Sequence, residues 1–255
     1  MKTYFKIIAL LLLLSGNQLY AQKKTQVLLL PTIHNAHETN SRYTYQHLLK
    51  IIENFKPDII AIEIRPEDMN QQDSVYLKTF YRPDMIMMMN KFPAIPKVGI
   101  DFLGIDQVGK TLALNYRRDT TTANAKAGAI SRAISRDPEF AAAYKTAGWQ
   151  ELENKRLALI ASASAQELID GPFDSYSNKM AAILDSLRAL KPQYAGFQMS
   201  STYRDQRLAD NVKDVILKNP GKRIIALSGV NHRGLYVQVM SKMPGVDFIT
   251  KVNDQ

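Results

Sequence analysis

Two histidines stand where two apolar runs typical of buried strands come to an end. His34 closes the run 27–33, and His232 follows the run 223–227 after the short segment Ser-Gly-Val-Asn. In open α/β sheets, ligands bind at the edge formed by the carboxyl ends of the strands. Imidazole can act as a base, an acid or a metal ligand near neutral pH. The two histidines therefore predict a catalytic or metal site at one edge of a sheet.

Three further polar residues have positions that lead to the same edge. Glu63 lies near the end of the run 58–65, and Asp101 lies near the end of the run 97–102. Arg204 begins an amphipathic helix that precedes the second histidine's strand. We expect Asp101 and His37, a histidine in the loop after the run 27–33, to be of secondary importance.

These residue types are suited to hydrolysis. His34 and Glu63 would activate water, either directly or by holding a metal-bound hydroxide. His232 would supply a second metal ligand or transfer a proton. Arg204 would bind an oxyanion or a substrate carboxylate, because guanidinium is a permanently charged, bidentate donor. His37, three residues after the first site histidine, is the secondary candidate.

Each residue also has a purely structural interpretation. Either site histidine could be a hydrogen-bonded loop residue. Glu63 could pair with Arg65 or a lysine, Arg204 could be solvated on its helix, and Asp101 could cap a turn. The joint placement at several strand ends favours the functional interpretation.

The elements that must position these residues follow from the spacing of apolar side chains. Strands are expected at 27–34, 58–65 and 97–102, with helices at 41–55 and 76–91 between them. A strand, a crossover helix and a second strand form a parallel pair. The pattern predicts the α/β class, with a mixed, mostly parallel sheet flanked by helices.

A helical insertion interrupts this pattern at about 121–195. Strand signals disappear there, and breaks at Asp137-Pro138 and Asp170-Gly171-Pro172 separate the expected helices 122–135, 138–147, 149–169 and 174–190. The alternation then resumes with a helix at 204–218, a strand at 223–227, a helix at 232–243 and an edge strand at 246–250. Residues 22–255 are thus expected to form a single domain with a helical cap.

The first 21 residues have the order of a secretory signal peptide. Lys2 and Lys6 precede the apolar stretch 7–14, and Ala21 offers a small residue for cleavage. An uncleaved anchor is the alternative, although the apolar stretch is short for a bilayer span. We expect export to the periplasm or the medium.

Composition narrows the possible functions. The chain has 45% hydrophobic and 22% charged residues, which is ordinary for a globular protein, and it has no cysteine. The absence of cysteine excludes a thiol nucleophile and thiolate metal ligands. The net charge of +9 is compatible with association with an anionic envelope surface. The sequence contains no nucleic-acid-binding motif, so a small molecule or peptide is the expected substrate.

Two other patterns in the sequence are compatible with different functions. Residues 104–111 match the phosphate-loop pattern after a predicted strand, although an ordinary turn into a helix near Val108 is the preferred interpretation. Four tyrosines could ligate haem iron, but their spacing does not select that role; they are Tyr43, Tyr45, Tyr76 and Tyr81.

Four segments together resemble the TraB/Tiki/erythromycin-esterase/ChaN-like superfamily. Pro31–His34 resembles its first GxxH element, with proline in place of the glycine, and Glu63 resembles its strand-borne glutamate. The segment 203–209 resembles its arginine-containing helix start, and Gly229–His232 matches its second GxxH element. The resemblance extends over nearly the whole chain after the signal peptide.

The resemblance implies an α/β core with a helical insertion and two kinds of function. Some members hydrolyse peptides with a divalent metal or open lactones without one, and others bind haem iron. We therefore expect an exported hydrolase of peptide, ester or lactone bonds. If it uses a divalent metal, the expected ligands are His34, Glu63 and His232. The alternative is a non-catalytic haem or iron binder.

Overall fold

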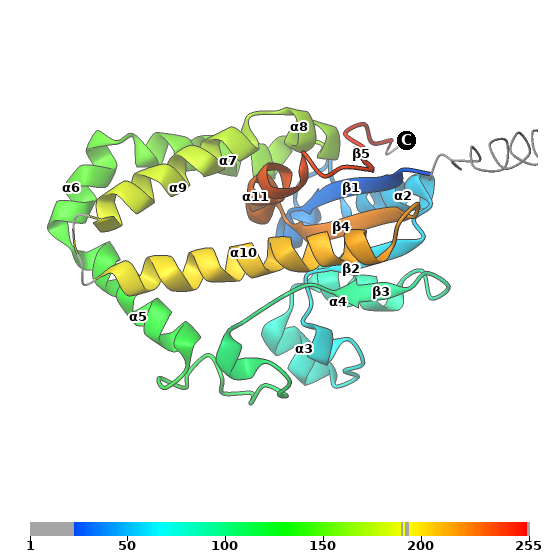
Figure 1. The fold of residues 1–255 in the computed structure, drawn as a ribbon. Coiled ribbons are helices and arrows are strands. Elements are labelled where there is room, and N and C mark those ends of the chain that lie inside the picture. Colours follow the sequence, from blue (N-terminus) through cyan, green and yellow to red (C-terminus); the bar gives the residue numbers. More distant parts are fainter. Residues whose placement is uncertain (1–22, 190, 192–193, 254–255) are drawn as a thin grey trace, which may run out of the picture.

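A five-stranded sheet in which every pair is parallel forms the centre of the computed structural model (Figure 1). The structure describes residues 23–189, 191 and 194–253, so the expected signal peptide at 1–21 lies outside the described residues. The strand order is β3-β2-β4-β1-β5. The strands are β1 (Thr25–Thr32), β2 (Ile59–Ile62), β3 (Lys97–Gly99), β4 (Arg223–Gly229) and β5 (Val246–Phe248). The expected α/β class is confirmed, and the described sheet is parallel throughout rather than mixed.

The strand order brings the two histidine-bearing strand ends side by side. The chain passes from β1 to β2 and leaves the place between them for β4, which arrives much later in the sequence. Thr32 of β1 is in register with Gly229 of β4, so both strands end at the same level. Parallel order therefore places the loops that follow β1, β2 and β4 at one edge.

Helices cover both faces of the sheet, which explains why the strands are continuously apolar. Leu28 and Leu30 of β1 face a core formed with α2 (Tyr45–Phe55), α3 (Ser74–Phe80) and α4 (Pro83–Asn90). The alternate residues Val27 and Leu29 face a second core. That core is formed with α10 (Ala195–Lys218) and α11 (Val230–Met240). The resulting three layers hold the strand ends in fixed positions.

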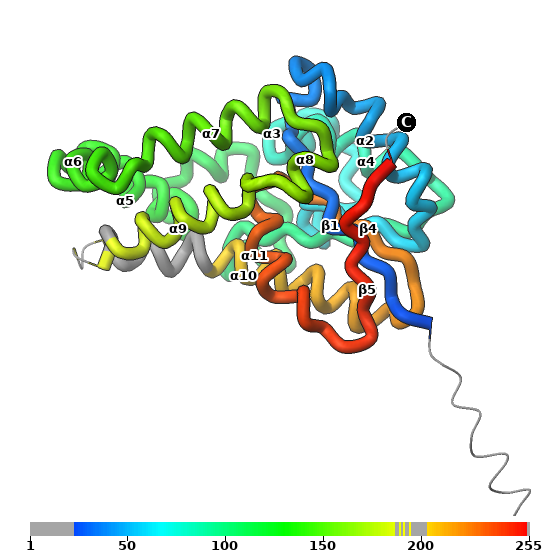
Figure 2. Tube along the Cα trace, turned by 90° about the horizontal axis from the view of Figure 1, so that it is seen from above, coloured from blue at the N-terminus to red at the C-terminus, as the bar shows by residue number. Residues whose placement is uncertain are grey.

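The segment between β3 and β4 is helical and projects beyond the carboxyl edge of the sheet (Figures 1 and 2). It contains α5 (Ala123–Arg136), α6 (Pro138–Thr146), α7 (Trp149–Ser162), α8 (Ala165–Asp170) and α9 (Phe173–Ala189). Helix α10 then returns along the second face of the sheet. No helix among the described residues is long and apolar enough to cross a membrane.

Two expected helices are each divided in the structure. The predicted helix 149–169 breaks at Ala163, because Ser164 caps α8 through a reciprocal pair of hydrogen bonds with Glu167. The predicted helix 76–91 breaks before Pro83, which occupies the first turn of α4 and cannot continue α3. Apolar periodicity continues through both breaks, so it does not reveal them.

The segment 104–111 is not a phosphate loop. It forms a short 3-10 turn, η3 (Ile105–Gln107), and the next α-helix begins only at Ala123. Buried Arg65 donates to the carbonyls of Gln107 at 2.7 Å and Lys110 at 2.9 Å, which fixes the segment against the sheet edge. The expected helix near Val108 is also absent, since the chain there remains irregular.

Candidate functional site

Four adjacent strands each bring one polar side chain to the carboxyl edge. In sheet order these are Asp101 after β3, Glu63 after β2, His232 in the first turn of α11 after β4, and His34 after β1. Because the strands are parallel and end at similar levels, residues far apart in sequence become neighbours. Arg204 reaches the same edge from α10.

Glu63 lies at the centre of this group. Its Oε1 is 3.1 Å from Nη2 of Arg204 and 3.3 Å from Nε2 of His232. Its Oε2 accepts a hydrogen bond of 2.7 Å from the backbone N–H of Gly229. Burial disfavours the charged carboxylate, but the His232 contact, the Arg204 charge and the Gly229 N–H together hold the pKa of Glu63 well below its usual range. Glu63 is therefore ionised at neutral pH.

Arg204 links two strand ends. Its Nη2 also donates to Oδ1 of Asp101 at 2.6 Å, and Asp101 accepts a second hydrogen bond of 2.6 Å from the N–H of Phe102. Burial, followed by the nearby Glu63 charge, raises the pKa of Asp101, while Arg204 opposes that shift. Asp101 thus caps the turn after β3, as the sequence allowed, and it also pairs with Arg204. Arg204 is not a solvated surface residue.

His232 is held between two carboxylates. Its Nδ1 lies 3.0 Å from Oδ1 of Asp205, and its Nε2 faces Glu63. Burial lowers the pKa of this imidazole, but Asp205 and Glu63 outweigh burial and raise the pKa to about 9. His232 is consequently a cation at neutral pH. It is suited to stabilising negative charge or donating a proton rather than to accepting one.

His34 has a different partner, a carboxylate that the sequence does not indicate. Its Nδ1 lies 3.0 Å from Oδ2 and 3.2 Å from Oδ1 of Asp84, a fully buried residue in the first turn of α4. Thr32 donates to the same Oδ2. Burial opposes ionisation, yet the hydrogen bonds and charge of His34 and the Thr32 hydroxyl lower the pKa of Asp84. The His34 backbone has a φ of 53°, an uncommon conformation that turns the residue out of the strand.

Because residue 229 is glycine, Nε2 of His34 can lie close to the end of β4 and to Glu63. A side-chain carbon added at Gly229 would lie 2.6 Å from Nε2 of His34 and 3.5 Å from Oε2 of Glu63. The Nε2 atom therefore packs against the last residue of β4, next to the Glu63 carboxylate. This close approach is a physical reason for glycine at the first position of Gly229–His232.

The secondary candidate His37 holds the loop after β1 and also contacts Thr32, whose Oγ1 lies 2.8 Å from Nε2 of His37 and bonds to Asp84. Its Nε2 accepts a hydrogen bond of 3.2 Å from the N–H of Ile33, and its Nδ1 lies 2.6 Å from the carbonyl of Tyr43. Burial lowers the pKa of His37, which favours the neutral ring that can accept one bond and donate the other. His37 thereby fixes the backbone beneath His34.

The sequence did not single out Asp84 and Asp205. Asp84 follows a proline in an expected helix, and acidic residues are common in the first turn of a helix, so it did not stand out. Asp205 follows Arg204 directly, so only the helix geometry shows that it faces His232. Both contacts depend on the packing of helices against the sheet edge.

The three expected metal ligands do not form a metal site in this arrangement. Arg204, His232 and the Gly229 N–H already contact both oxygens of Glu63, and Nδ1 of His34 is engaged with Asp84. Across the residues that the structure describes, no three His, Asp or Glu side chains are grouped to hold an ion. We therefore derive no step through a metal.

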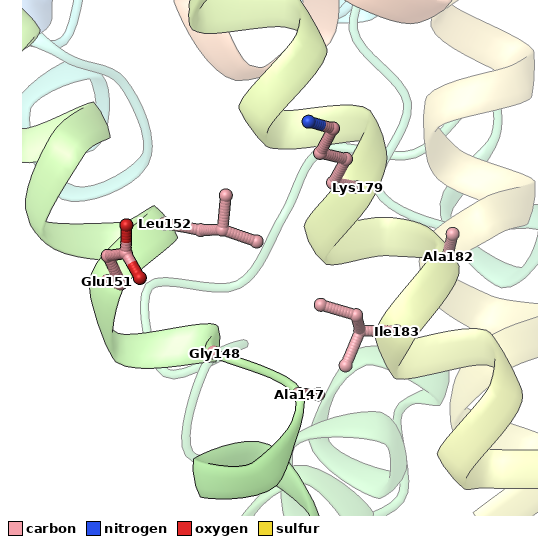
Figure 3. Close-up of a pocket in the computed structure, with 7 residues that line it drawn as sticks. All are labelled: Ala147, Gly148, Glu151, Leu152, Lys179, Ala182 and Ile183. Atoms are coloured by element: carbon pink, nitrogen blue, oxygen red, sulfur yellow. The ribbon is translucent and has the colours of Figure 1, made fainter.

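A hollow of about 380 Å³ lies on the insertion, away from the strand ends (Figure 3). Leu152 of α7 and Ile183 of α9 extend toward each other across it. The full lining is Ala147, Gly148, Glu151, Leu152, Lys179, Ala182 and Ile183. None of the edge residues contributes to it, so it is separate from the candidate site.

Comparison with known proteins finds no match to a family model, to a curated protein or to a solved structure. The superfamily resemblance therefore depends on the four short segments alone.

Proposed function

We propose that the chain is an exported hydrolase that activates water with His34 held by Asp84. The observation that carries the proposal is the pair itself, in which a fully buried carboxylate contacts Nδ1 of His34 at 3.0 Å. A carboxylate at Nδ1 favours the tautomer in which that nitrogen carries the proton and Nε2 carries the lone pair. A histidine oriented in this way is suited to act as a general base.

The proton transfers follow from this orientation. Nε2 of His34 accepts a proton from water, and the resulting hydroxide attacks the carbonyl carbon of the substrate. The carbonyl oxygen becomes negative as the tetrahedral intermediate forms. The protonated imidazole, stabilised by Asp84, then returns its proton to the departing oxygen or nitrogen. Each step uses an atom that can both accept and donate a proton near neutral pH.

The neighbouring cations support stabilisation of the developing negative charge. Arg204 and protonated His232 contact Oε1 of Glu63, the carboxylate whose Oε2 accepts from Gly229, and both cations are partly buried. Fixed charges in such a site need no reorganisation when the oxyanion forms. Glu63 and Asp101 hold the two cations in place rather than attacking the substrate.

The bonds that fit this chemistry are carbonyl bonds in a small molecule or peptide. The substrate would be an ester, a lactone or a peptide, as the superfamily resemblance implies. That resemblance and the strand-edge location favour the same reaction, although each short motif is unspecific by itself.

The alternative of haem binding gains no support from the tyrosines. Tyr43 donates to the carbonyl of Pro31 at 2.6 Å, and Tyr76 and Tyr81 both donate to Asp68. These three side chains are buried, so their hydroxyls are committed within the protein. The fourth tyrosine, Tyr45, is half-buried and donates to the carbonyl of His34 at 3.3 Å.

The test is a hydrolysis screen of the mature protein on 4-nitrophenyl esters, aliphatic lactones and fluorogenic peptides. We expect turnover above the solvent rate that survives excess chelator and is lost in His34→Gln. Turnover that disappears with chelator and returns with a divalent ion would replace direct water activation with a metal-bound water. A Soret band on addition of haem, without hydrolysis, would support the binder instead.

A further inference from the structure

Helix α7 of the insertion contacts the first turn of α11, which carries His232. Arg156 of α7 donates through Nη2 to Oδ1 of Asn231, the residue before His232. The guanidinium lies 5.2 Å from the ring centre of Phe173, and its Nη1 donates to Glu153 at 2.8 Å. Arg156 is thus held from several sides while it contacts the histidine's neighbour.

The C-terminal end of α7 contacts the loop that carries His34. Buried Asn40 donates through Nδ2 to the carbonyls of Ile160 and Ala163, each at 2.9 Å. Its Oδ1 accepts from the N–H of Tyr43 at 3.0 Å within its own loop. One side chain therefore satisfies carbonyls at the end of α7 and fixes the backbone of the first loop.

Helix α9 holds the opposite side of the same turn of α11. Arg233, the residue after His232, is buried, and its Nη1 donates to Asp174. A side chain at Gly234 would lie 3.0 Å from Oδ1 of Asn178, so the two helices are in close contact there. The residues before and after His232 are consequently both bound to the insertion.

We propose that α7 is a brace that sets the relative positions of His34 and His232, with Arg156 and Asn40 as its positioning residues. Its hydrogen bonds connect the loop after β1 to the first turn of α11 after β4, and β1 and β4 end side by side. Its importance for catalysis rests on the proposed function, whereas the geometric coupling does not. The insertion is accordingly part of the site's framework and not only a cover over it.

The experiment uses ring signals of the histidines in the mature protein, which contains all four of the chain. Nuclear magnetic resonance of protein labelled at the histidine rings is recorded at one fixed pH for wild type, Arg156→Met and Arg156→Lys. We expect Arg156→Met to shift or broaden the His232 ring signals relative to wild type. The lysine variant should show a smaller change. His47, which caps α2, should stay unchanged.

The matched control is Lys155→Met, which removes the same charge from the neighbouring position of α7. Lys155 pairs with Glu151 at the surface, and its Nζ lies 5.7 Å from the ring centre of Tyr176 in α9, so all four histidines should keep their signals. Unchanged His232 signals in Arg156→Met, or equal changes in both variants, would overturn the proposal. If Arg156→Met does not fold, Asn231→Ala removes the acceptor of the same contact and is judged by the same signals. Because no substrate is needed, failure of the brace is distinguishable from failure of the hydrolase.

Discussion

Gly229 decides how closely His34 can approach the end of β4. Its φ of −51° and ψ of 137° are open to any residue, so the backbone alone does not require glycine. The requirement comes from Nε2 of His34, which a side-chain carbon would meet at 2.6 Å. The residue therefore acts through the histidine and not through the strand.

We predict that Gly229→Ala lowers kcat/KM by about 100-fold, because a displacement of about 1 Å is sufficient for such a loss. The unfolding free energy should fall by about 1–3 kcal/mol as the histidine is pushed aside. Steady-state kinetics on the best ester of the screen and urea denaturation measure the two effects. Gly128→Ala in α5 is the control, since a side-chain carbon added there would meet the flexible end of Arg132 at 3.4 Å. Equal activity in the two variants would contradict the role given to Gly229.

The ionised pair of His232 and Glu63 should make stability depend on pH. The pKa of His232 is about 9 in the folded protein and 6.5 ordinarily. A raised folded pKa gives stability that is fully present below about pH 6.5 and is lost as pH rises through about 9. The pKa of Glu63 is lowered, so its contribution to stability has the opposite pH dependence. That contribution is present above pH 4.5, the ordinary pKa of a glutamate, and is lost as the pH falls below it.

We therefore predict that the unfolding free energy falls between pH 6 and pH 9.5 by at most about 3 kcal/mol through His232. Urea denaturation of wild type and His232→Gln at both pH values measures this share, because the variant should lack it. The same loss in both proteins would show that His232 is not held as a cation.

The sequence could indicate His34, Glu63, His232 and Arg204 because three of them follow apolar runs and the fourth begins an amphipathic helix. Parallel strands place these positions at one edge of the sheet, although which of them become neighbours depends on the strand order. Asp84 could not be found in this way, since its contact with His34 depends on how α4 packs against the first loop. A residue whose partner comes from helix packing leaves no local pattern.

At the scale of elements, Asn40 joins the first loop to the end of α7. Removing its amide would take this partner from the carbonyls of Ile160 and Ala163 and from the N–H of Arg42. The N–H of Tyr43 would keep only its longer bond of 3.4 Å to the backbone carbonyl of residue 40. Buried polar groups left without partners are costly.

We predict that Asn40→Ala lowers the unfolding free energy by about 2–4 kcal/mol, given about 1 kcal/mol or more for each orphaned buried group. Chemical denaturation followed by circular dichroism is the measurement. Thr39→Ala is the neighbouring control, because the Thr39 hydroxyl makes only an exposed bond of 3.3 Å to Ala36 and should change stability by less than about 0.5 kcal/mol. A small effect of Asn40→Ala would mean that α7 is not anchored to the loop.

Apolar periodicity located most elements but not their ends. The helix expected at 41–55 begins at Tyr45, because Thr44 and His47 form a reciprocal cap. The helix expected at 204–218 begins at Ala195. Caps and helix extensions depend on one or two polar contacts, which a repeat of apolar residues does not record.

At the scale of the whole molecule, the α/β class and the helical insertion could be predicted from the order of strand-like and helix-like apolar patterns along the chain. The position of β4 between β1 and β2 did not, because the order of strands in a sheet is decided by packing and not by local pattern. That order is what makes neighbours of the two histidines.

Export remains a proposal about the whole chain, resting on residues 1–21, which lie outside the described part. We predict that protein isolated from the cell envelope or medium begins at Gln22, because Ala21 is the small residue at the expected cleavage site. Intact-mass spectrometry is the check. A full-length N-terminus in the cytoplasmic fraction would overturn the assignment of compartment.

The pairing of His34 with Asp84 is tested most directly by the ratio of kcat/KM between wild type and Asp84→Asn on the best ester of the screen, in excess chelator. The asparagine keeps the shape of the side chain but removes the charge that orients Nδ1 of His34 and stabilises its protonated form. We predict a loss of about 100-fold or more, the usual contribution of a general base, with the fold retained by circular dichroism. A folded Asp84→Asn protein that hydrolyses the ester at the wild-type rate would contradict the account.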